Sequence, residues 1–283
     1  MDHEIALQEL IKNALAEDIG TGDHSTLASV DRDAEGKAVL KIKQDGILAG
    51  VKVAEKIFRF IQPDTIFTAI KHDGEKMAYG ETAFEVFAKV HTILQCERLV
   101  LNTMQRMSGI STLTDRYVQK LSGYQTKLLD TRKTTPNFRL LEKEAVKIGG
   151  GVNHRFGLYD MIMLKDNHID YSGGIERAIN NAHDYIIKNK LPLRTEVETR
   201  SIDDVKKVMA VGKVDRIMLD NFTPDQVREA LQIIGRKYET EASGGINLEN
   251  IEQYAGTGVD YVSCGAVIHQ AVSLDLSLKA AIL

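Results

Sequence analysis

The sequence predicts an α/β protein in which a small mixed domain is followed by a parallel, barrel-like array of strands and helices. Up to about residue 110, short alternating strand patterns are interrupted by helical patterns, which is typical of an α+β domain. From Lys127 onward, apolar strand-like runs alternate with helical patterns about six times, as parallel strands require because each pair needs a crossover. The later units follow one another at short, regular intervals, which favours a curved array over an open sheet.

The first part of the chain contains two helical patterns and four strand patterns. The helical patterns cover Glu4–Glu17 and Val51–Ile61. The strand patterns cover Ala38–Ile42, Gly46–Ala49, Thr65–Ile70 and Ala83–Lys89. A long helical pattern then runs from His91 to about Leu121, and we expect it to break near Gly109. Such a helix is suited to connect two domains.

The second part of the chain supplies the repeated strand and helix units. Its strand-like runs are Lys127–Leu129, Met161–Leu164, Thr195–Val197, Arg216–Leu219, Tyr238–Ala242 and Tyr261–Ser263. Its helical patterns are Phe138–Ile148, Gly174–Lys188, Ile202–Ala210, Pro224–Ile234 and Leu248–Tyr254. Thr223 before Pro224 and Asn247 before Leu248 are favourable helix starts.

Composition excludes several classes of protein. The 283 residues include 36 Lys and Arg against 40 Asp and Glu, a net charge of -4 that argues against a nucleic-acid binder working by bulk electrostatics. No apolar run approaches the roughly 18 to 20 residues that span a bilayer. The start alternates charged with apolar residues, unlike a secretory signal. The two cysteines, Cys96 and Cys264, suggest a reducing compartment. These observations predict a cytoplasmic protein with no membrane or nucleic-acid partner.

Chemically useful residues collect where the barrel strands end. In βα barrels the working residues stand at the C-terminal ends of the strands. Here, in chain order, those positions are Asp130–Thr135, Lys165–His168, Glu198, Asp220–Asn221, Ser243–Gly245 and Cys264–Ala266, and a further basic cluster, Asn153–Arg155, follows Gly149–Gly151. A single charged pair in a loop is usually a solvated surface, but five successive strands that end in charged or glycine-rich turns indicate a site.

The types of residue predict a small substrate that carries a phosphate. Glycine pairs leave backbone N–H groups free to approach a phosphate, and late barrel loops often form such sites. The basic residues Arg132, Lys133, Arg155 and Lys165 suit further anionic groups. Glu198 and Asp220 are placed for Mg²⁺ or for sugar hydroxyls. Glu196 and Glu198 share one side of their strand. They could face solvent at an edge, but the apolar neighbouring strands favour burial against cationic or metal partners. Lys165 could simply extend its amine to solvent.

The sequences of these motifs are similar to those of the quinolinate phosphoribosyltransferase family. The motifs that carry the resemblance are Asp130–Pro136, Gly149–Arg155, Lys165–His168, Leu219–Asn221 and Glu241–Gly245, with Glu17–Gly20, Glu97–Arg98, Ser108–Ile110 and Thr257–Tyr261 in addition. They cover nearly the whole chain in order. The resemblance implies an N-terminal α/β sandwich domain joined to an open, six-stranded parallel βα barrel of the type II phosphoribosyltransferase kind. We expect the domains at residues 1–110 and 111–269, with segment 270–283 as a candidate to pack on the first.

The resemblance also implies a reaction and a set of roles. Quinolinate and phosphoribosyl pyrophosphate would give nicotinate mononucleotide, pyrophosphate and CO₂, with Mg²⁺, in de novo NAD synthesis. It assigns Arg98, Arg132, His154, Arg155 and Lys165 to the quinolinate carboxylates; Lys133 and Lys165 to the phosphates; Glu198 and Asp220 to the ribose hydroxyls and the metal; and Ser243, Gly244, Gly245, Cys264, Gly265 and Ala266 to the 5'-phosphate. Thr134 is expected among the substrate-binding residues. The catalytic set is then Lys133, Lys165, Glu198 and Asp220. The residue matching Arg98 comes from the partner subunit in this family, so a homodimer is the minimum unit.

Other functions are compatible with parts of the same pattern. A related phosphoribosyltransferase could use nicotinate or another ring acid, although the number of cations favours a dicarboxylate. An aldolase-like lyase could use Lys165 as a Schiff-base lysine, but it would leave Arg98, Arg132 and Arg155 without a role. A non-catalytic relative would not need complete sets of cations and carboxylates. The contacts of His168 and His269 with the site, the position of Glu196 relative to a metal and an assembly larger than a dimer are left open by the sequence.

Overall fold

A computed structural model describes residues 3–281, and the chain forms two compact units. One unit comprises the chain up to Asp115, Thr134–Gly150 and the segment from Val267 onward. The other comprises Arg116–Lys133 and Gly151–Ala266. The chain therefore passes between the two units several times.

An antiparallel sheet with strand order β12-β1-β5-β3 organises the first unit. Its strands are β1 (Glu35–Ile42), β3 (Ile66–Ala69), β5 (Thr82–Lys89) and β12 (Leu276–Ala281), and a separate ribbon pairs β2 (Gly46–Ile47) with β4 (Lys76–Met77). In β1, the alternate residues Ala38, Leu40 and Ile42 are buried, as the alternating sequence pattern predicts. Strand β12 was not among the predicted strands. It pairs with β1 over six residue pairs, so the end of the chain belongs to this sheet.

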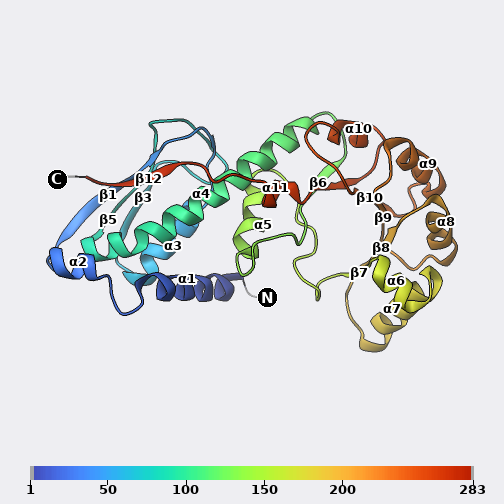
Figure 1. The fold of residues 1–283 in the computed structure, drawn as a ribbon, viewed down its shortest axis with the longest axis horizontal. Helices are drawn as coiled ribbons and strands as arrows, with labels where there is room; N and C mark the ends of the chain where they lie inside the picture. Colours follow the sequence, from blue (N-terminus) through green and yellow to red (C-terminus); the bar gives the residue numbers. More distant parts are fainter. Residues whose placement is uncertain (1–2, 282–283) are drawn as a thin grey trace. The chain divides into compact units, whose positions relative to one another are not determined.

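Helices cover one side of this sheet, as Figure 1 shows for α1, α3 and the first half of α4. The helices of the unit are α1 (His3–Ile19), α2 (His24–Ser29), α3 (Val51–Ile61), α4 (Val90–Lys120, which continues into the other unit), α5 (Arg139–Ile148) and α11 (Ala266–His269). Phe58 of α3 packs edge-on against Phe84 of β5, with 6.1 Å between the ring centroids. The ring centroids of Phe84 and of Phe67 on β3 are 4.5 Å apart. This aromatic cluster joins helix and sheet in the core.

Helix α4 is continuous through Gly109, so the expected break at that position is wrong. The glycine is needed for a close approach between segments. A Cβ atom at Gly109 would lie 2.1 Å from the backbone oxygen of Val272, and one at Gly149 would lie 2.4 Å from that of Ser111. The lack of a side chain at Gly109 lets the segment that contains Val272 pack on the backbone of α4. The lack of a side chain at Gly149 lets this residue pack on Ser111 of α4. Packing, not helix termination, explains these two motif glycines.

A buried ion pair fastens three segments of the first unit. Oε1 of Glu142 on α5 lies 2.9 Å from Nε and 2.8 Å from Nη2 of Arg106 on α4. The same carboxylate accepts hydrogen bonds from the backbone and side chain of Thr135, at 2.8 and 2.9 Å. The Arg106 guanidinium also donates to the carbonyls of Ile268 and Ala271. One ion pair therefore joins α4, α5 together with Thr135 before it, and α11 together with Ala271 after it.

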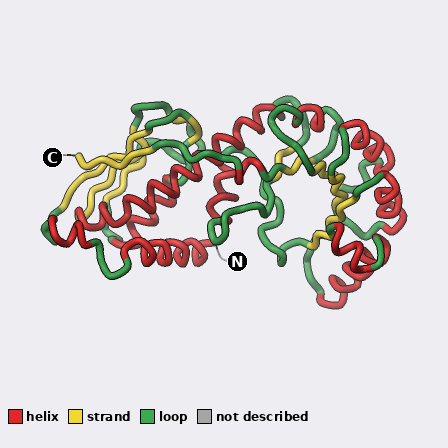
Figure 2. Tube along the Cα trace, in the orientation of Figure 1, coloured by secondary structure: helices red, strands yellow, loops and turns green. Residues whose placement is uncertain are grey.

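The second unit is an open barrel of six parallel strands in the order β6-β11-β10-β9-β8-β7. Its strands are β6 (Lys127–Leu129), β7 (Ile162–Leu164), β8 (Thr195–Thr199), β9 (Arg216–Asp220), β10 (Glu239–Ser243) and β11 (Tyr261–Ser263). Its helices are α6 (Asp166–Ser172), α7 (Ile175–Asn189), α8 (Ile202–Val211), α9 (Pro224–Ile234) and α10 (Ile251–Ala255). In Figure 2 the strands follow an arc with these helices on its outer side. Strands β6 and β7 are the two edges, so the barrel is open between them.

Local sequence patterns located this unit well. All six predicted strands are present, and the four helical patterns from Gly174 onward correspond to α7, α8, α9 and α10. Thr223 accepts a hydrogen bond from the backbone of Gln226 and starts α9, as expected. The short helices α6 and α11 were not predicted, because each is a single turn or two without an apolar period long enough to recognise.

Replacing Gly109 with Ala should lower the free energy of unfolding by about 2–3 kcal/mol, because the added methyl group overlaps the Val272 carbonyl. Urea unfolding followed by circular dichroism measures this. Gly36→Ala is the matched control, since its nearest neighbour is a movable Val90 methyl group at 3.1 Å, and a change below about 1 kcal/mol is expected. Equal stability of Gly109→Ala and the wild type would contradict the role of Gly109 in close packing.

Candidate active site

Strand alternation sorts the charged residues of the barrel into layers. Residues two apart on a strand point to the same face, so Glu196 and Glu198 of β8 share a face, as do Glu239, Glu241 and Ser243 of β10. The intervening residues Val197 of β8, Ile217 and Leu219 of β9 and Ala242 of β10 are apolar and fully buried. Since the helices lie outside the arc, these apolar residues face the helices, and the charged residues point into the barrel.

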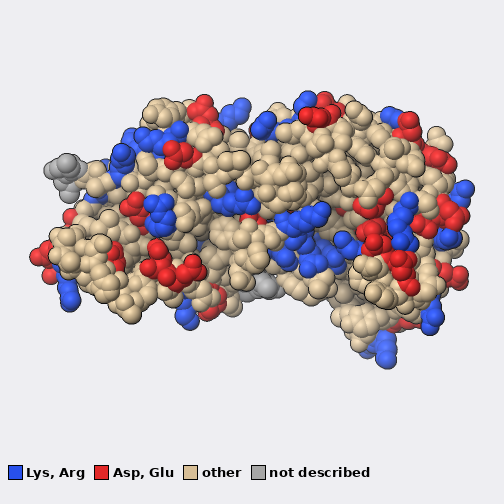
Figure 3. Space-filling model, viewed as in Figure 1, with Lys and Arg blue, Asp and Glu red and all other residues tan. Residues whose placement is uncertain are grey.

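The upper layer lies at the C-terminal edge and contains Glu198, Asp220 and Ser243. Glu198 is buried, with 9% of its surface exposed, while Asp220 is half-buried and Lys165 at the end of β7 is exposed. Burial and then the negative charge of Asp220 raise the pKa of Glu198, and Lys165 acts in the opposite direction. Two carboxylates and one amine therefore act on one another at this edge. Figure 3 shows one face of the molecule, on which several Lys and Arg side chains lie close to Asp and Glu side chains.

The layer beneath is a buried network of His154, Glu196, Glu241 and Arg216. Nε2 of His154 lies 2.9 Å from Oε2 of Glu196 and 3.2 Å from Oε2 of Glu241. Nη1 of Arg216 lies 3.1 Å from the same Glu241 oxygen, and Nη2 lies 3.0 Å from Glu239. The two inner carboxylates are completely buried, and the His154 side chain is 5% exposed. We call these four residues the buried network.

The buried network changes the protonation of its members. Burial alone lowers the pKa of His154, but hydrogen bonds to Glu196 and Glu241 outweigh it and raise the pKa to about 9. Burial and the nearby Glu241 charge raise the pKa of Glu196. Burial likewise favours the neutral form of Glu241, but hydrogen bonds from His154 and Ser263 lower its pKa below the usual value. The three titratable groups have the spacing of metal ligands, but Arg216 already supplies a positive charge there.

Asp130 holds the loop that carries His154 and Arg155. Its carboxylate is completely buried at the end of β6 and accepts hydrogen bonds from Nδ2 of Asn153 at 2.6 Å and from the backbone of His154 at 2.8 Å. The following Arg155 is partly buried, and burial and then Arg132 lower its pKa. Asp130 therefore fixes the geometry of the basic cluster, whose Arg155 is close enough to Arg132 for the two guanidinium groups to repel each other.

The segment after β6 carries the other predicted cations. Arg132 is partly buried and Lys133 is exposed, and the backbone of Lys133 donates to Oγ1 of Thr131 at 3.0 Å. Thr134 begins a segment of the first unit, where its hydroxyl accepts a hydrogen bond from Nε of Arg139 at 2.9 Å. Arg98 lies on α4 of the first unit with its side chain exposed. The barrel unit by itself thus contains all the predicted site residues except Arg98 and Thr134.

The glycine-rich turns after β10 and β11 complete the upper edge. A Cβ atom at Gly244, whose φ is +94°, would lie 2.2 Å from Oδ1 of Asn221, so a glycine is required there. Gly245 also has a positive φ and has open space where its Cβ would be. After β11, the buried thiol of Cys264 contacts the Ile246 carbonyl at 3.3 Å, and partly buried Gly265 and Ala266 follow. Backbone groups, with Ser243, are what these turns offer to a ligand.

Two histidines that the sequence left open have structural positions. Nδ1 of His168 accepts a hydrogen bond from the backbone of Lys165 at 3.0 Å, so this ring caps the start of α6. His269 is exposed on α11, in the first unit. Glu196 belongs to the buried network, where it contacts His154. Glu198 belongs to the upper layer, where it interacts with Asp220 and Lys165.

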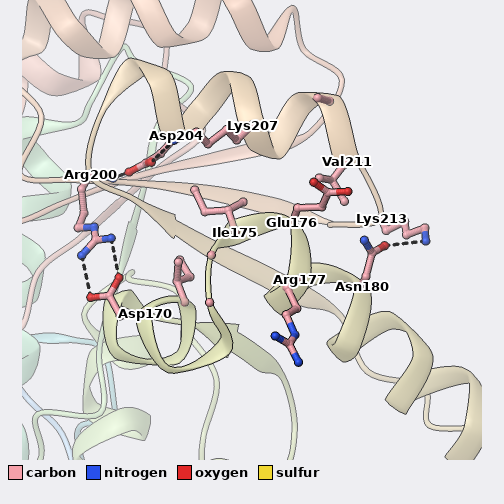
Figure 4. A pocket seen from close by; sticks show the side chains of 14 residues that line it. Asp170, Ile175, Glu176, Arg177, Asn180, Arg200, Asp204, Lys207, Val211 and Lys213 are labelled. Carbon is pink, nitrogen blue, oxygen red and sulfur yellow. Dashed lines mark hydrogen bonds and ion pairs between the residues drawn. The ribbon is translucent and has the colours of Figure 1, made fainter.

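A hollow of about 960 Å³ lies elsewhere on the barrel unit, along α6, α7 and α8. Figure 4 shows the bidentate pair of Arg200 with Asp170 at one end and the contact of Lys213 with Asn180 at the other. It contains none of the predicted site residues.

Sequence reasoning missed Arg216, Glu239 and the roles of Asp130 and Glu241. The available signal was a charged residue within an otherwise apolar buried strand, which requires a partner. That signal identifies Arg216 and Glu241 as unusual, but their pairing depends on the register of β9 against β8 and β10.

Replacing Asp130 with Ala should cost about 3 kcal/mol of stability, because the Asn153 amide and the His154 backbone N–H lose a buried acceptor. Thermal and urea unfolding check this. Asp225→Ala, which removes an exposed carboxylate paired only with Arg228 within α9, should change stability by less than about 0.5 kcal/mol. Similar behaviour of the two variants would refute the role of Asp130.

Comparison with known families gives matches along almost the whole chain. Residues 23–108 match the N-terminal domain, and residues 110–279 the C-terminal domain, of quinolinate phosphoribosyl transferase. A quinolinate phosphoribosyltransferase [decarboxylating] of Nicotiana tabacum is 42% identical, over 96% of this chain and 82% of that protein. A probable nicotinate-nucleotide pyrophosphorylase [carboxylating] of Bacillus subtilis is 41% identical, over 98% and 94%.

Solved structures agree with this likeness. The crystal structure of NadC from Streptococcus pyogenes has a TM-score of 0.91 and 40% sequence identity, and the match covers 97% of this chain and 96% of that one. The expected combination of a sheet domain with an open six-stranded parallel barrel is confirmed.

Proposed function

The chain belongs to the quinolinate phosphoribosyltransferase family, and we propose that it transfers the phosphoribosyl group of phosphoribosyl pyrophosphate to quinolinate. The products are nicotinate mononucleotide, pyrophosphate and CO₂, a step of de novo NAD synthesis. The observation that carries the proposal is the segregation of charge at one barrel edge, with Arg132, Arg155 and Lys165 on loops and Glu198 beside Asp220 on strands.

The cations are suited to the two carboxylates of quinolinate. We assign Arg132, Arg155 and Lys165 to them, with His154 beneath, and Lys133 and Lys165 to the phosphates. Several cations for one ring acid favour a dicarboxylate, because a monocarboxylate would leave a desolvated cation unpaired. The mutual repulsion of Arg132 and Arg155 supports this, since a bound carboxylate would relieve it.

The reaction needs no activated nucleophile. The pyridine nitrogen attacks C1 of the ribose as pyrophosphate leaves, and the resulting positive charge develops on an oxocarbenium-like ribose. Glu198 and Asp220 place negative charge where that positive charge develops and can accept hydrogen bonds from the ribose hydroxyls. Lys133 and Lys165 stabilise the departing pyrophosphate. Once the ring nitrogen is cationic, the ring carbon holds the electron pair released as the adjacent carboxylate leaves as CO₂, and that carbon then takes up a proton from solvent.

Glu198 and Asp220 also suit Mg²⁺. Hard carboxylate oxygens together with substrate phosphates form its usual ligand set. Burial and then the negative charge of Asp220 raise the pKa of Glu198, and a cation bound between the two carboxylates would relieve their repulsion. When bound, Mg²⁺ supplies charge neutralisation to the pyrophosphate leaving group. Ser243–Gly245 and Cys264–Ala266 would receive the 5'-phosphate on their backbone N–H groups, which fits the space left at Gly245.

We further propose a homodimer in which exposed Arg98 enters the site of the partner subunit.

The free, buried thiols of Cys96 and Cys264 support a reducing, cytoplasmic setting. No helix among residues 3–281 combines the length and apolar character needed to cross a membrane.

The matched relatives do not favour a lyase with a Schiff base on Lys165, and borohydride trapping with phosphorylated sugars should give no adduct at that residue.

The proposal is tested with purified protein, Mg²⁺, phosphoribosyl pyrophosphate and either quinolinate or nicotinate. Quinolinate should give nicotinate mononucleotide and an equal amount of CO₂, and nicotinate should give little product. Chromatography of the nucleotide together with release of labelled CO₂ provides the measurement. Product from nicotinate and none from quinolinate would exclude our assignment in favour of a paralogous transferase.

Arg132→Ala should weaken quinolinate binding at least about 50-fold, because a guanidinium forms two charge-assisted hydrogen bonds to a carboxylate. Calorimetric titration measures the dissociation constant, and circular dichroism should show an unchanged fold. Arg228→Ala on α9, an exposed arginine outside the site, should bind quinolinate like the wild type. Unchanged affinity in Arg132→Ala would remove Arg132 from the substrate site.

Glu198→Gln should raise the Mg²⁺ concentration for half-maximal activity at least about tenfold, since it removes a charged oxygen ligand. The activity is measured over a series of Mg²⁺ concentrations at saturating substrates. Asp225→Asn, an exposed carboxylate on α9, serves as the control and should leave the Mg²⁺ dependence unchanged. The same Mg²⁺ dependence in Glu198→Gln and the wild type would be incompatible with a metal ligand at Glu198.

A further inference from the structure

The layer beneath the proposed substrate site is charged, although barrel interiors are usually filled with branched apolar side chains. Glu196 and Glu241 are completely buried, and burying a carboxylate costs several kcal/mol unless it is paired. An apolar layer of similar volume would cost less. The buried network therefore calls for an explanation beyond stability.

The contacts of the network converge on one ring. Glu196 from β8 and Glu241 from β10 both place an oxygen within 3.2 Å of Nε2 of His154. Asp130 from the end of β6 holds the backbone of the same residue, and Ser263 of β11 donates to Glu241. Arg216 of β9 fixes Glu241 from the other side. Every strand that faces this ring thus contributes a polar or charged group to its position.

The carboxylates cannot themselves touch a ligand, since both are completely enclosed. The His154 side chain, by contrast, retains a small exposed fraction, and its loop continues directly into Arg155. An effect of Glu241 on a ligand must therefore pass through His154. Glu241 is also the inner carboxylate that Arg216 holds most closely, at 3.1 Å against 3.9 Å for Glu196.

We propose that Glu241 is a positioning residue for the ring-acid substrate, which it serves by fixing the orientation of the His154 ring and, through that ring, the backbone of Arg155 beside the substrate carboxylates. This inference rests on the proposed function. Oε2 of Glu241 accepts a hydrogen bond from Nε2–H of the imidazole, and Arg216 keeps Glu241 ionised and aimed at the ring. Nδ1 of the same ring accepts a hydrogen bond from the backbone N–H of Arg155 at 2.6 Å. The charged layer thus holds the ring that anchors Arg155.

Strand β10 offers a matched pair of variants. Glu241→Gln keeps the shape of the side chain and removes the charge that faces His154, while Arg216 retains Glu239 as a partner. Glu239→Gln removes a carboxylate from the same arginine but does not reach His154, and Arg216 retains Glu241. A role in stability alone would affect both variants. A positioning role separates them.

In Glu241→Gln, the dissociation constant and KM for quinolinate should rise about tenfold or more, while the dissociation constant for phosphoribosyl pyrophosphate stays within about twofold. Glu239→Gln should follow the wild type with both substrates.

Equal quinolinate affinity in Glu241→Gln and Glu239→Gln would overturn the inference, as would parallel weakening of both substrates in Glu241→Gln. If Glu241→Gln does not fold, Arg216→Lys tests the same link, since it keeps the charge but loses the fork that aims Glu241, and selective weakening of quinolinate is again expected. A wild-type protein that binds no quinolinate would instead reject the proposed function, so the two failures are distinguishable.

Discussion

The interior of the barrel can hold charged side chains only where each charge has an opposite partner. Arg216 meets this requirement by reaching Glu239 and Glu241 at the same time, and His154 meets it by resting between Glu241 and Glu196. Because a partnerless carboxylate at this depth would be strongly destabilising, the network is either complete or absent. The paired side chains hold β8, β9 and β10 together at this depth, and these strands carry the residues of the upper layer.

The upper layer depends on that base in a simple geometric way. Glu198 lies two residues beyond Glu196 on β8, and Ser243 lies two residues beyond Glu241 on β10, so each projects from the same face of its strand. The register between β9 and β10 sets Asp220 opposite Ser243. A polar upper layer above a charged, fully paired lower layer is a rigid arrangement, which is what a site for a highly charged substrate requires.

The loops around this edge are held by a second set of contacts. Asp130 binds the loop of His154 and Arg155 inside the barrel unit. In the first unit, Glu142 binds Thr135, two residues after Lys133, while its partner Arg106 donates hydrogen bonds to the carbonyls of Ile268 in α11 and of Ala271 after it. Both carboxylates belong to or contact conspicuous motifs, yet neither is exposed to a ligand. Both carboxylates accept hydrogen bonds from the backbone and so fix the geometry of their loops. The neighbouring cations remain available to bind the substrate.

Local patterns in the sequence were sufficient to locate the six barrel strands, the main helices and the residues at the strand ends. Each of these depends on the polarity of near neighbours in the chain: the apolar run before Lys165 marks β7, and the alternation around Val197 places Glu196 and Glu198 on one face. The family resemblance, confirmed along the chain, rests on the same short motifs.

Only the tertiary structure decided which charges meet. The pairing of Arg216 with Glu239 and Glu241, the place of His154 between two strands, the addition of β12 to the first sheet and the close packing at Gly109 all join residues far apart in sequence. Such contacts are set by strand register and by the approach of one segment to another, and these quantities leave no local periodicity in the chain. For the same reason the sequence could name Glu198 as a site residue but could not separate its role from that of Glu196, two positions away.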